Sequence, residues 1–416
     1  MTRALSAAPF ALLLTLLLAI APAALAAPPR PPDVSAPAAI VMESSTGDVP
    51  FRVNDRQRRP IASTTKIMTA LLTLKRAQLD EVFTSPGYEG DPAESVIDLK
   101  AGEELTVRDL LRGLLLASAN DAAVTLAQGV SGSTEAFVKL MNRQARRLRL
   151  RDTSYANPIG LDDPDNYSTA RDLARLALVL RRDDFARETM DLPRATLRSG
   201  NKRRRIVNRN RLVRRVPIVD GVKTGRTNIA GYILVGSATR KGVTVVSVVL
   251  DEPSEAARDA DTVALLDYGL SRYKRVRPVR KGQSVGQATV RYGAGASTAL
   301  VAGASFKRVV ERGRKVTVTP RGVPDEIEGP QPAGYRAGTL IVRAGRKVVA
   351  RVPVVTAAPV PPPKKIEQAK EAVLRPVVLL PAIGLVLVVG SLLVVGVTRR
   401  RRARRAERRA RRKTPA

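Results

Sequence analysis

A serine and a lysine three residues apart are the first residues of this chain whose types and spacing indicate chemistry. Ser63 and Lys66 stand at the start of an apolar run with helical periodicity. Positions i and i+3 share one face of a helix, so the hydroxyl and the amine can meet in a cleft and act as nucleophile and base. The same spacing also arises by chance, with the serine as a helix cap and the lysine at the surface.

Composition decides which chemistry is open to this pair. The chain has 416 residues and contains no histidine and no cysteine. Ser-His-Asp catalysis, cysteine nucleophiles and metal sites built from histidine or cysteine are therefore excluded. A nucleophilic serine in this chain needs lysine as its base, and we expect neither a metal nor a cofactor.

Two more motifs follow in the chain. Ser118-Ala119-Asn120 lies between two predicted helices, and Lys223-Thr224-Gly225 ends an extended run. The order S-x-x-K, S-x-N, K-T-G is that of penicillin-binding proteins and β-lactamases. Each motif alone is weak, but the three in this order make a specific signal.

The chain resembles the D-alanyl-D-alanine carboxypeptidases, which are the low-molecular-mass penicillin-binding proteins of serine peptidase family S11. The resemblance covers about residues 38–273 and includes Asn157-Pro158-Ile159-Gly160-Leu161 and residues 168–174 and 219–225. It implies an α/β (α+β) penicillin-binding/β-lactamase-like transpeptidase domain, with an antiparallel sheet flanked by helices, followed by an all-β domain.

The resemblance also implies a catalytic set of Ser63, Lys66 and Ser118. Ser63 would attack the carbonyl of the penultimate D-alanine of a peptidoglycan stem peptide and form an acyl-enzyme. Lys66, kept neutral by burial and by the nearby charge of Lys223, would take the serine proton. Ser118 would pass a proton to the leaving D-alanine. β-Lactams would acylate the same serine as covalent inhibitors.

The implied substrate-binding residues surround this set. They are Asn120 for the peptide amide, Lys223 and Thr224 for the terminal carboxylate, Gly225 for space along the strand, and Arg226. The backbone N–H groups of Ser63 and Arg226 would form the oxyanion hole.

Two positions depart from the family pattern. Ala119 replaces a more usual glycine, and we expect a tolerated cost of about 1 kcal/mol if this position needs a positive φ. Ile159 stands where the family often has a histidine. This departure removes any role of that histidine and leaves the serine chemistry intact.

Several elements must position these residues. Strands are predicted at 38–42, 49–53, 218–224, 230–238 and 243–250, and a closing helix at 254–273. Thr106 with Asp109, and Thr169 with Asp172, have the spacing of capping boxes that begin helices. The pattern of two strands, a helical middle, three strands and a helix predicts an α/β domain with an antiparallel sheet.

The two ends of the chain predict where the protein is located and how it lies in the membrane. Residues 1–26 read as a signal peptide, and 27–37 as a flexible lead-in. A catalytic domain at 38–275 and an all-β domain at 276–356, which resembles the β-sandwich stalk of the family, precede a Pro-rich linker at 357–376. An apolar membrane span at 377–397 and a basic cytoplasmic tail at 398–416 complete a type I arrangement. The expected partners are therefore cell-wall peptides and the membrane, and not nucleic acid.

Residues 399–413 carry +10 of the net charge of +33, and the remainder is spread over the main body of the chain. Residues 399–413 hold eleven Lys or Arg and one acid, and residues 198–215 hold nine and no acid. The second run is either a basic rim near the site or a solvated hairpin.

Other functions remain to be weighed. A class A β-lactamase needs a glutamate for deacylation, and between Asn120 and Lys223 the only glutamates are Glu135 and Glu188, neither in a suitable setting. A D,D-endopeptidase acting on cross-links uses the same catalytic residues and stays open. A non-catalytic wall-binding protein is disfavoured by the intact motif set. The oligomeric state is not predicted.

Overall fold

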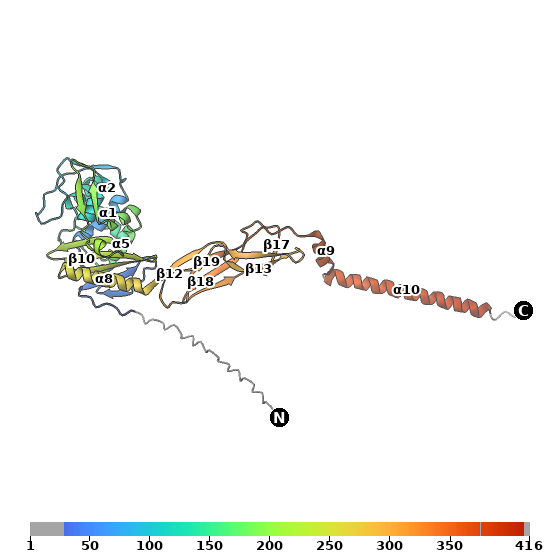
Figure 1. Ribbon diagram of the computed structural model, residues 1–416. Helices are drawn as coiled ribbons and strands as arrows, with labels where there is room; N and C mark the ends of the chain where they lie inside the picture. The colour runs from blue at the N-terminus through green and yellow to red at the C-terminus, as the bar shows by residue number, and fades with distance from the viewer. Residues whose placement is uncertain (1–28, 375, 412–416) are drawn as a thin grey trace, which may run out of the picture. The chain divides into compact units, whose positions relative to one another are not determined.

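The computed structural model describes residues 29–374 and 376–411, and the predicted signal peptide lies outside them (Figure 1). The chain divides into two compact units. One contains the residues up to Lys274 together with Glu311–Gly313, and the other contains Arg275–Val310 and the residues from Arg314. The division falls one residue from the predicted domain boundary.

The first unit is built on a five-stranded antiparallel sheet. Its order is β2-β1-β11-β10-β9, so the first strands of the domain pair with its last ones. The strands are β1 (Ala38–Glu43), β2 (Phe51–Val53), β9 (Val219–Thr227), β10 (Gly231–Arg240) and β11 (Val243–Glu252). The predicted strands are all present.

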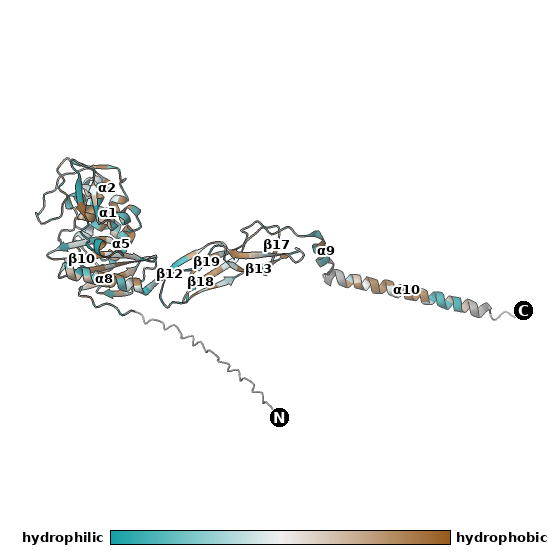
Figure 2. Ribbon diagram, viewed as in Figure 1, coloured by the Kyte–Doolittle hydropathy of each residue, from teal (hydrophilic) through white to brown (hydrophobic). Residues whose placement is uncertain are grey.

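Helices cover both faces of this sheet (Figures 1 and 2). Helix α8 (Glu255–Arg272) packs on β10 and β11, and α5 (Ala170–Leu180) packs on β11 and β1. All six residues of β1 are buried. A strand covered on both faces needs apolar side chains on each, which explains the continuous apolar run at 38–42.

A helical region stands beyond α5 and shares its core with the sheet. It contains a 3-10 turn (Ala62–Thr65), α1 (Lys66–Leu74), α2 (Val107–Arg112), a π-helical turn (Gly113–Ala117), α3 (Asn120–Ser131), α4 (Thr134–Arg147), α6 (Asp184–Asp191) and α7 (Leu212–Arg215). Thr106 and Thr169 accept hydrogen bonds from the backbone N–H groups of Asp109 and Asp172, so both predicted caps are confirmed.

Short two-stranded pairs connect these helices. They are β3 (Arg59–Pro60) with β6 (Tyr167–Ser168), β4 (Val82–Thr84) with β5 (Glu104–Thr106), and β7 (Arg194–Leu197) with β8 (Arg204–Val207). The predicted lead-in is attached to the domain before β1 begins, because the backbone N–H groups of Ser35 and Ala36 donate to the Asp261 carboxylate.

The second unit has a separate apolar core inside an all-β fold. Its six-stranded sheet has the order β16-β18-β19-β14-β13-β17, and β12 pairs with β15. The strands are β12 (Tyr273–Val279), β13 (Ser284–Arg291), β14 (Ser297–Ala302), β15 (Phe306–Glu311), β16 (Val316–Arg321), β17 (Glu326–Glu328), β18 (Arg336–Ala344) and β19 (Lys347–Thr356).

The predicted linker is partly helical. Residues 357–364 form no helix, but α9 (Lys365–Leu374) follows the last proline of the run, Pro363, because its sequence is rich in Lys, Glu, Gln and Ala. Helix α10 (Pro376–Arg411) comes next, and its part at Leu380–Ala406 is long and apolar enough to cross a membrane. The predicted span at 377–397 lies within this helix.

Buried Arg181, just after α5, fixes strand β9. Its guanidinium donates to the carbonyl of Asp220 at 2.9 Å, to the Asp220 carboxylate at 3.0 Å and to Ser237 Oγ at 2.6 Å. The end of α5 is thereby bonded to the strand that carries the K-T-G motif.

Replacing Arg181 by methionine should lower the free energy of unfolding by about 3 kcal/mol, because a largely buried carboxylate loses its ion-pair partner. Arg175→Met is the matched control: it lies on α5 itself, is half exposed and faces Asp172 at 3.8 Å. We expect the control to lose less than about 1 kcal/mol. Urea unfolding of both variants measures the difference, and equal losses would contradict the anchoring role of Arg181.

Candidate active site

Ser63 and Lys66 meet at the junction of two helical turns. Ser63 lies in the 3-10 turn before α1, and Lys66 is the first residue of α1. The Lys66 Nζ lies 2.9 Å from Ser63 Oγ. Lys66 is completely buried, whereas Ser63 lines an open cavity. The alternative interpretation, in which Lys66 is a surface lysine and the motif is a chance match, is therefore wrong.

Two other oxygen atoms hold the Lys66 amine. Nζ donates to Asn120 Oδ1 at 2.6 Å and to the carbonyl of Ile159 at 2.5 Å. Ile159 occupies the position at which the family often has histidine. It acts here through its backbone, which any residue type supplies.

The pKa of Lys66 is strongly perturbed by its surroundings. Burial, and after it the charge of Lys223, lower the pKa of Lys66 well below the usual lysine value. A neutral amine has two N–H donors and one lone pair. The carbonyl of Ile159 and Asn120 Oδ1 can only accept, so they take both donors. In the neutral form of Lys66 the lone pair is therefore left for the hydroxyl of Ser63, which then becomes the donor of this contact.

The orientation of the Asn120 amide depends on a glutamate. Asn120 Nδ2 donates to the Glu94 carboxylate, which also accepts from the hydroxyl of Tyr88. An ionised carboxylate only accepts hydrogen bonds, so Asn120 must turn its NH₂ to Glu94 and its oxygen to Lys66. Burial and the Glu94 hydrogen bond raise the pKa of Tyr88, which keeps it a donor. No motif or spacing in the sequence pointed to Tyr88 or Glu94.

Ser118 ends the π-helical turn in a left-handed conformation. Its φ is 66° and its ψ 29°, and its N–H donates to the carbonyl of Gly113. Ala119 has a φ of −62°. The condition under which we expected a cost at Ala119 is therefore not met, because the left-handed residue is Ser118.

Strand β9 forms the opposite side of the site. Lys223 is buried, and its Nζ donates to the carbonyl of Thr224 at 2.9 Å. Burial, followed by the charges of Arg209 and Arg258, lowers the pKa of Lys223 to about 7. Arg209 belongs to the basic run at 198–215 and was not singled out from the sequence.

Two glycines allow the strand and a loop to approach the nucleophile. A Cβ on Gly225 would lie 3.1 Å from the carbonyl oxygen of Ile61 and 3.3 Å from the Ser63 nitrogen. A Cβ on Gly160 would lie 2.0 Å from the carbonyl oxygen of Ala62, and Gly160 has a φ of +92°. Any side chain at Gly160 would displace the turn that carries Ser63.

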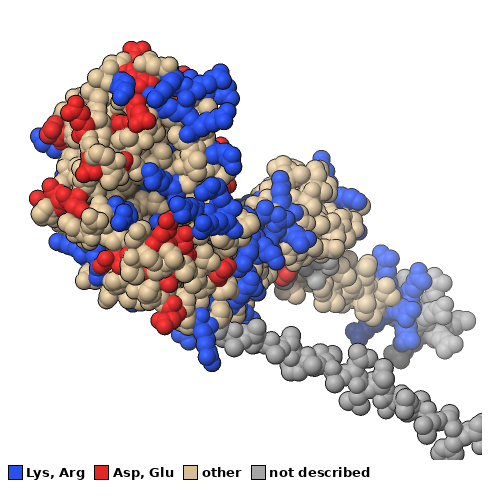
Figure 3. Space-filling model, turned by 60° about the vertical axis from the view of Figure 1, so that its left-hand side comes forward, with Lys and Arg blue, Asp and Glu red and all other residues tan. Residues whose placement is uncertain are grey.

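These residues surround one cavity of about 780 Å³. Ser63, Ser118, Thr224, Gly225 and Arg226 line it, while Lys66, Asn120 and Lys223 are buried next to the lining residues. Figure 3 shows Lys and Arg gathered around a hollow on one face of this unit. Within residues 29–374 and 376–411, no group of three or more His, Cys, Asp or Glu is placed to hold a metal ion.

Comparison with protein families assigns both units. The model of the family described as D-alanyl-D-alanine carboxypeptidase, Peptidase S11, matches residues 25–254. The model of the C-terminal domain of penicillin-binding protein 5 matches residues 273–362. The first match contains all the motifs described above.

Individual proteins agree with these matches. D-alanyl-D-alanine carboxypeptidase DacF of Bacillus subtilis is 34% identical over 77% of this chain and 84% of that protein. A D-alanyl-D-alanine endopeptidase of Pseudomonas aeruginosa is 34% identical over 61% of this chain and 86% of that protein. Penicillin-binding protein 5 from Haemophilus influenzae superposes with a TM-score of 0.59 at 28% identity, over 80% of this chain and 99% of that chain. This chain therefore belongs to the D-alanyl-D-alanine carboxypeptidases of peptidase family S11, which are serine-type hydrolases.

Proposed function

We propose that this protein removes the terminal D-alanine from peptidoglycan stem pentapeptides through an acyl-enzyme on Ser63, and that penicillin acylates the same serine. One observation carries the proposal: the amine of the buried Lys66 lies 2.9 Å from the hydroxyl oxygen of Ser63, which lines a cavity beside the K-T-G strand. This is the arrangement of an activated nucleophile in a chain without histidine.

Acylation begins at Ser63. Its Oγ attacks the carbonyl carbon of the penultimate D-alanine while Lys66 Nζ takes the hydroxyl proton. The carbonyl oxygen becomes an oxyanion, for which the N–H groups of Ser63 and Arg226 are the donors. The close approach that Gly225 permits between β9 and the Ser63 turn supports this pairing of donors.

Ser118 then acts on the leaving group. It passes a proton, ultimately the one held by Lys66, to the nitrogen of the departing D-alanine, and the C–N bond breaks. Water attacks the acyl-enzyme in the second half of the reaction, with Lys66 again taking a proton. The ester bond to Ser63 breaks, and the serine recovers its proton.

Substrate binding uses the other predicted residues. Lys223 in its ammonium form and the hydroxyl of Thr224 hold the terminal carboxylate, with Arg209 adding positive charge. Asn120 Nδ2 has two hydrogens, of which Glu94 takes one. The other is free for the peptide amide of the substrate.

The proposed location is the outer side of a cell membrane. The apolar segment within Leu380–Ala406 and the arginine cluster after it support a single span with a cytoplasmic C-terminus. The signal-like sequence at 1–26 supports export of the catalytic unit toward the wall.

D,D-endopeptidase activity on cross-links is a second candidate. The cavity of about 780 Å³ has room for a longer leaving group than one alanine, and the Pseudomonas aeruginosa endopeptidase is a relative. Incubation with a pentapeptide and with a cross-linked muropeptide separates the two activities by product mass. Loss of one alanine supports the carboxypeptidase, and cleavage of the cross-link supports the endopeptidase.

Ser63→Ala should abolish both D-alanine release and labelling by a fluorescent penicillin, because among the described residues Ser63 supplies the hydroxyl that is hydrogen-bonded to Lys66. Ser131→Ala, a serine of α3 that bonds only backbone carbonyls, serves as the control and should behave as the wild type. The readouts are D-alanine release and in-gel fluorescence. Labelling that persists in Ser63→Ala would refute the assignment.

Glu94→Gln should slow acylation by roughly 10-fold or more, because a charge-assisted hydrogen bond to Asn120 is worth about 1.5–3 kcal/mol. The negative charge of Glu94 raises the pKa of Lys66, opposing burial and Lys223. Its loss should therefore move the acid limb of the kcat–pH profile to lower pH. Glu89→Gln, an exposed change in the same loop, is the control. An unshifted acid limb in Glu94→Gln would exclude this role.

Alkaline pH should weaken substrate binding. The pKa of Lys223 is about 7 in the free enzyme, so above that pH Lys223 loses the charge that attracts the terminal carboxylate. KM should rise above about pH 7, and kcat should change less because a bound carboxylate stabilises the ammonium. In Lys223→Arg the charge persists, so the rise in KM should vanish. A rise that remains in Lys223→Arg would place its cause elsewhere.

A further inference from the structure

Five arginines form one wall of the active-site cavity. They are Arg203, Arg205, Arg209, Arg211 and Arg214, called the arginine wall below. They come from β8, α7 and the residues around them, within the basic run at 198–215. The proposed mechanism uses only Arg209.

The wall carries charge without matching acids. All five side chains are exposed. Among the residues that the structure describes, only Arg211 of the five has an ion pair, at 3.4 Å from Glu255, which Arg258 shares. Asp98 and Glu255 are the acidic residues in the cavity lining.

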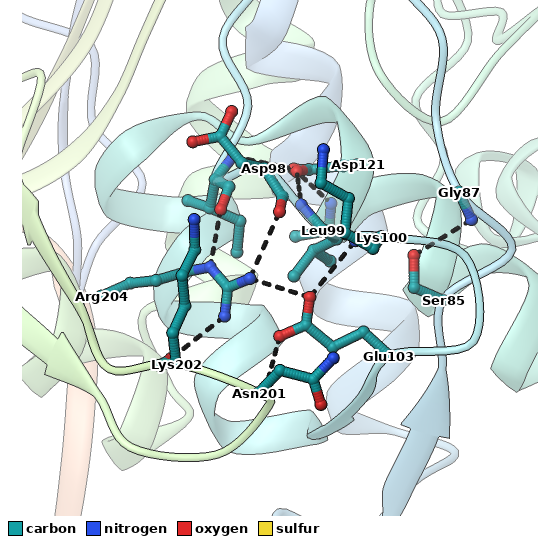
Figure 4. A network of polar contacts seen from close by, with 12 residues as sticks. Ser85, Gly87, Asp98, Leu99, Lys100, Glu103, Asp121, Asn201, Lys202 and Arg204 are labelled. Atoms are coloured by element: carbon teal, nitrogen blue, oxygen red, sulfur yellow. Dashed lines mark hydrogen bonds and ion pairs between the residues drawn. The ribbon is translucent and has the colours of Figure 1, made fainter.

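A buried ionic network holds the wall in place (Figure 4). Arg204 lies between Arg203 and Arg205 in the sequence, and its side chain is buried whereas theirs are exposed. Its guanidinium donates to the carbonyl of Ile97 at 2.7 Å and to the Glu103 carboxylate at 2.8 Å. Glu103 also accepts from the backbone N–H of Asn201 at 2.8 Å. Although burial opposes it, the Arg204 hydrogen bond helps to hold the pKa of Glu103 below its usual value.

Further contacts fix both ends of the segment. Asp109 accepts from the N–H groups of Arg198 and Ser199 at 2.7 and 2.9 Å. Asn210 Nδ2 donates to the carbonyl of Gly221 on β9 at 3.0 Å. The backbone that carries the wall is therefore anchored on both sides, and the basic run is a hairpin with exposed arginines that also forms a rim of the cavity.

The positive charges of these arginines repel one another, and an anion placed among them reduces that repulsion. The effect of the wall already reaches the reaction site, since Arg209 contributes to the lowered pKa of Lys223. Guanidinium groups bind carboxylates with two parallel hydrogen bonds. Because the wall and Ser63 share one cavity, a substrate bound at Ser63 would also lie beside the wall.

We propose that the arginine wall binds a second carboxylate of the substrate, borne in addition to the terminal carboxylate held by Lys223 and Thr224. This inference rests on the proposed function and names its substrate class: acidic peptides with a free carboxylate away from the terminal D-alanine.

The test compares substrates that differ by one charge. One pair of pentapeptides ends in D-Ala-D-Ala and carries either a free carboxylate or its amide on the acyl side. A second, cross-linked pair carries the same difference on the leaving side. The full-length protein in detergent should favour the free carboxylate by about tenfold in kcat/KM in at least one pair. The pair that responds identifies the side of the scissile bond.

The double variant Arg203→Ala/Arg205→Ala should reduce that preference to about twofold or less, mainly through KM. Arg194→Ala/Arg198→Ala is the matched control, because it removes two exposed arginines of the same hairpin that do not line the cavity. Arg214→Ala on α7 repeats the test from a second element if the double variant folds poorly. Unfolding midpoints monitor the fold.

Equal rates for amide and carboxylate in both pairs, with D-alanine still released, would overturn the inference and leave the proposed function standing. An equal loss of preference in the control would also overturn it, since the effect would then come from net charge. Absence of D-alanine release from every substrate would overturn the proposed function and the inference with it.

Discussion

The burial of the Lys66 amine is the constraint on which the site depends. A charged ammonium is costly away from water, and the charge of Lys223 disfavours it further, so the pKa of Lys66 lies well below the usual lysine value. In the neutral form of Lys66, Asn120 and Ile159 take its two N–H groups, which leaves the lone pair for Ser63. Without that enclosure the pair would be a surface lysine beside an ordinary alcohol.

Several elements of the catalytic unit place the residues that surround the Lys66 amine. Helix α1 presents Lys66, α3 presents Asn120, and the loop at Gly160 closes over the turn that carries Ser63. Strand β9 brings Lys223 close, and Arg181 bonds that strand to the end of α5. The anionic substrate and the base are thereby coupled. A carboxylate at Lys223 offsets the charge that lowers the pKa of Lys66, so binding makes Lys66 a stronger base.

Arginine side chains are concentrated around the cavity that contains Ser63, next to Lys223. Arg209 lowers the pKa of Lys223, and the other arginines extend the positive surface along the same cavity. The buried pair of Arg204 and Glu103 keeps their strand in place. A buried ion pair contributes little net stability on average, but it fixes the position of the groups around it. The arrangement thus supplies orientation more than stability.

The order of the motifs, the strands of the sheet and the caps at Thr106 and Thr169 could be predicted from the sequence, because each depends on residue type and local spacing. The sequence also predicted that Ser63 and Lys66 meet, since they lie one helical turn apart. Three features could not be predicted from local sequence: the partners that enclose the Lys66 amine, the orientation of Asn120 by Glu94 across 26 residues of chain, and the place of the arginine run in the cavity lining. Burial, amide orientation and shared cavities arise between segments distant in sequence, and no local pattern encodes them.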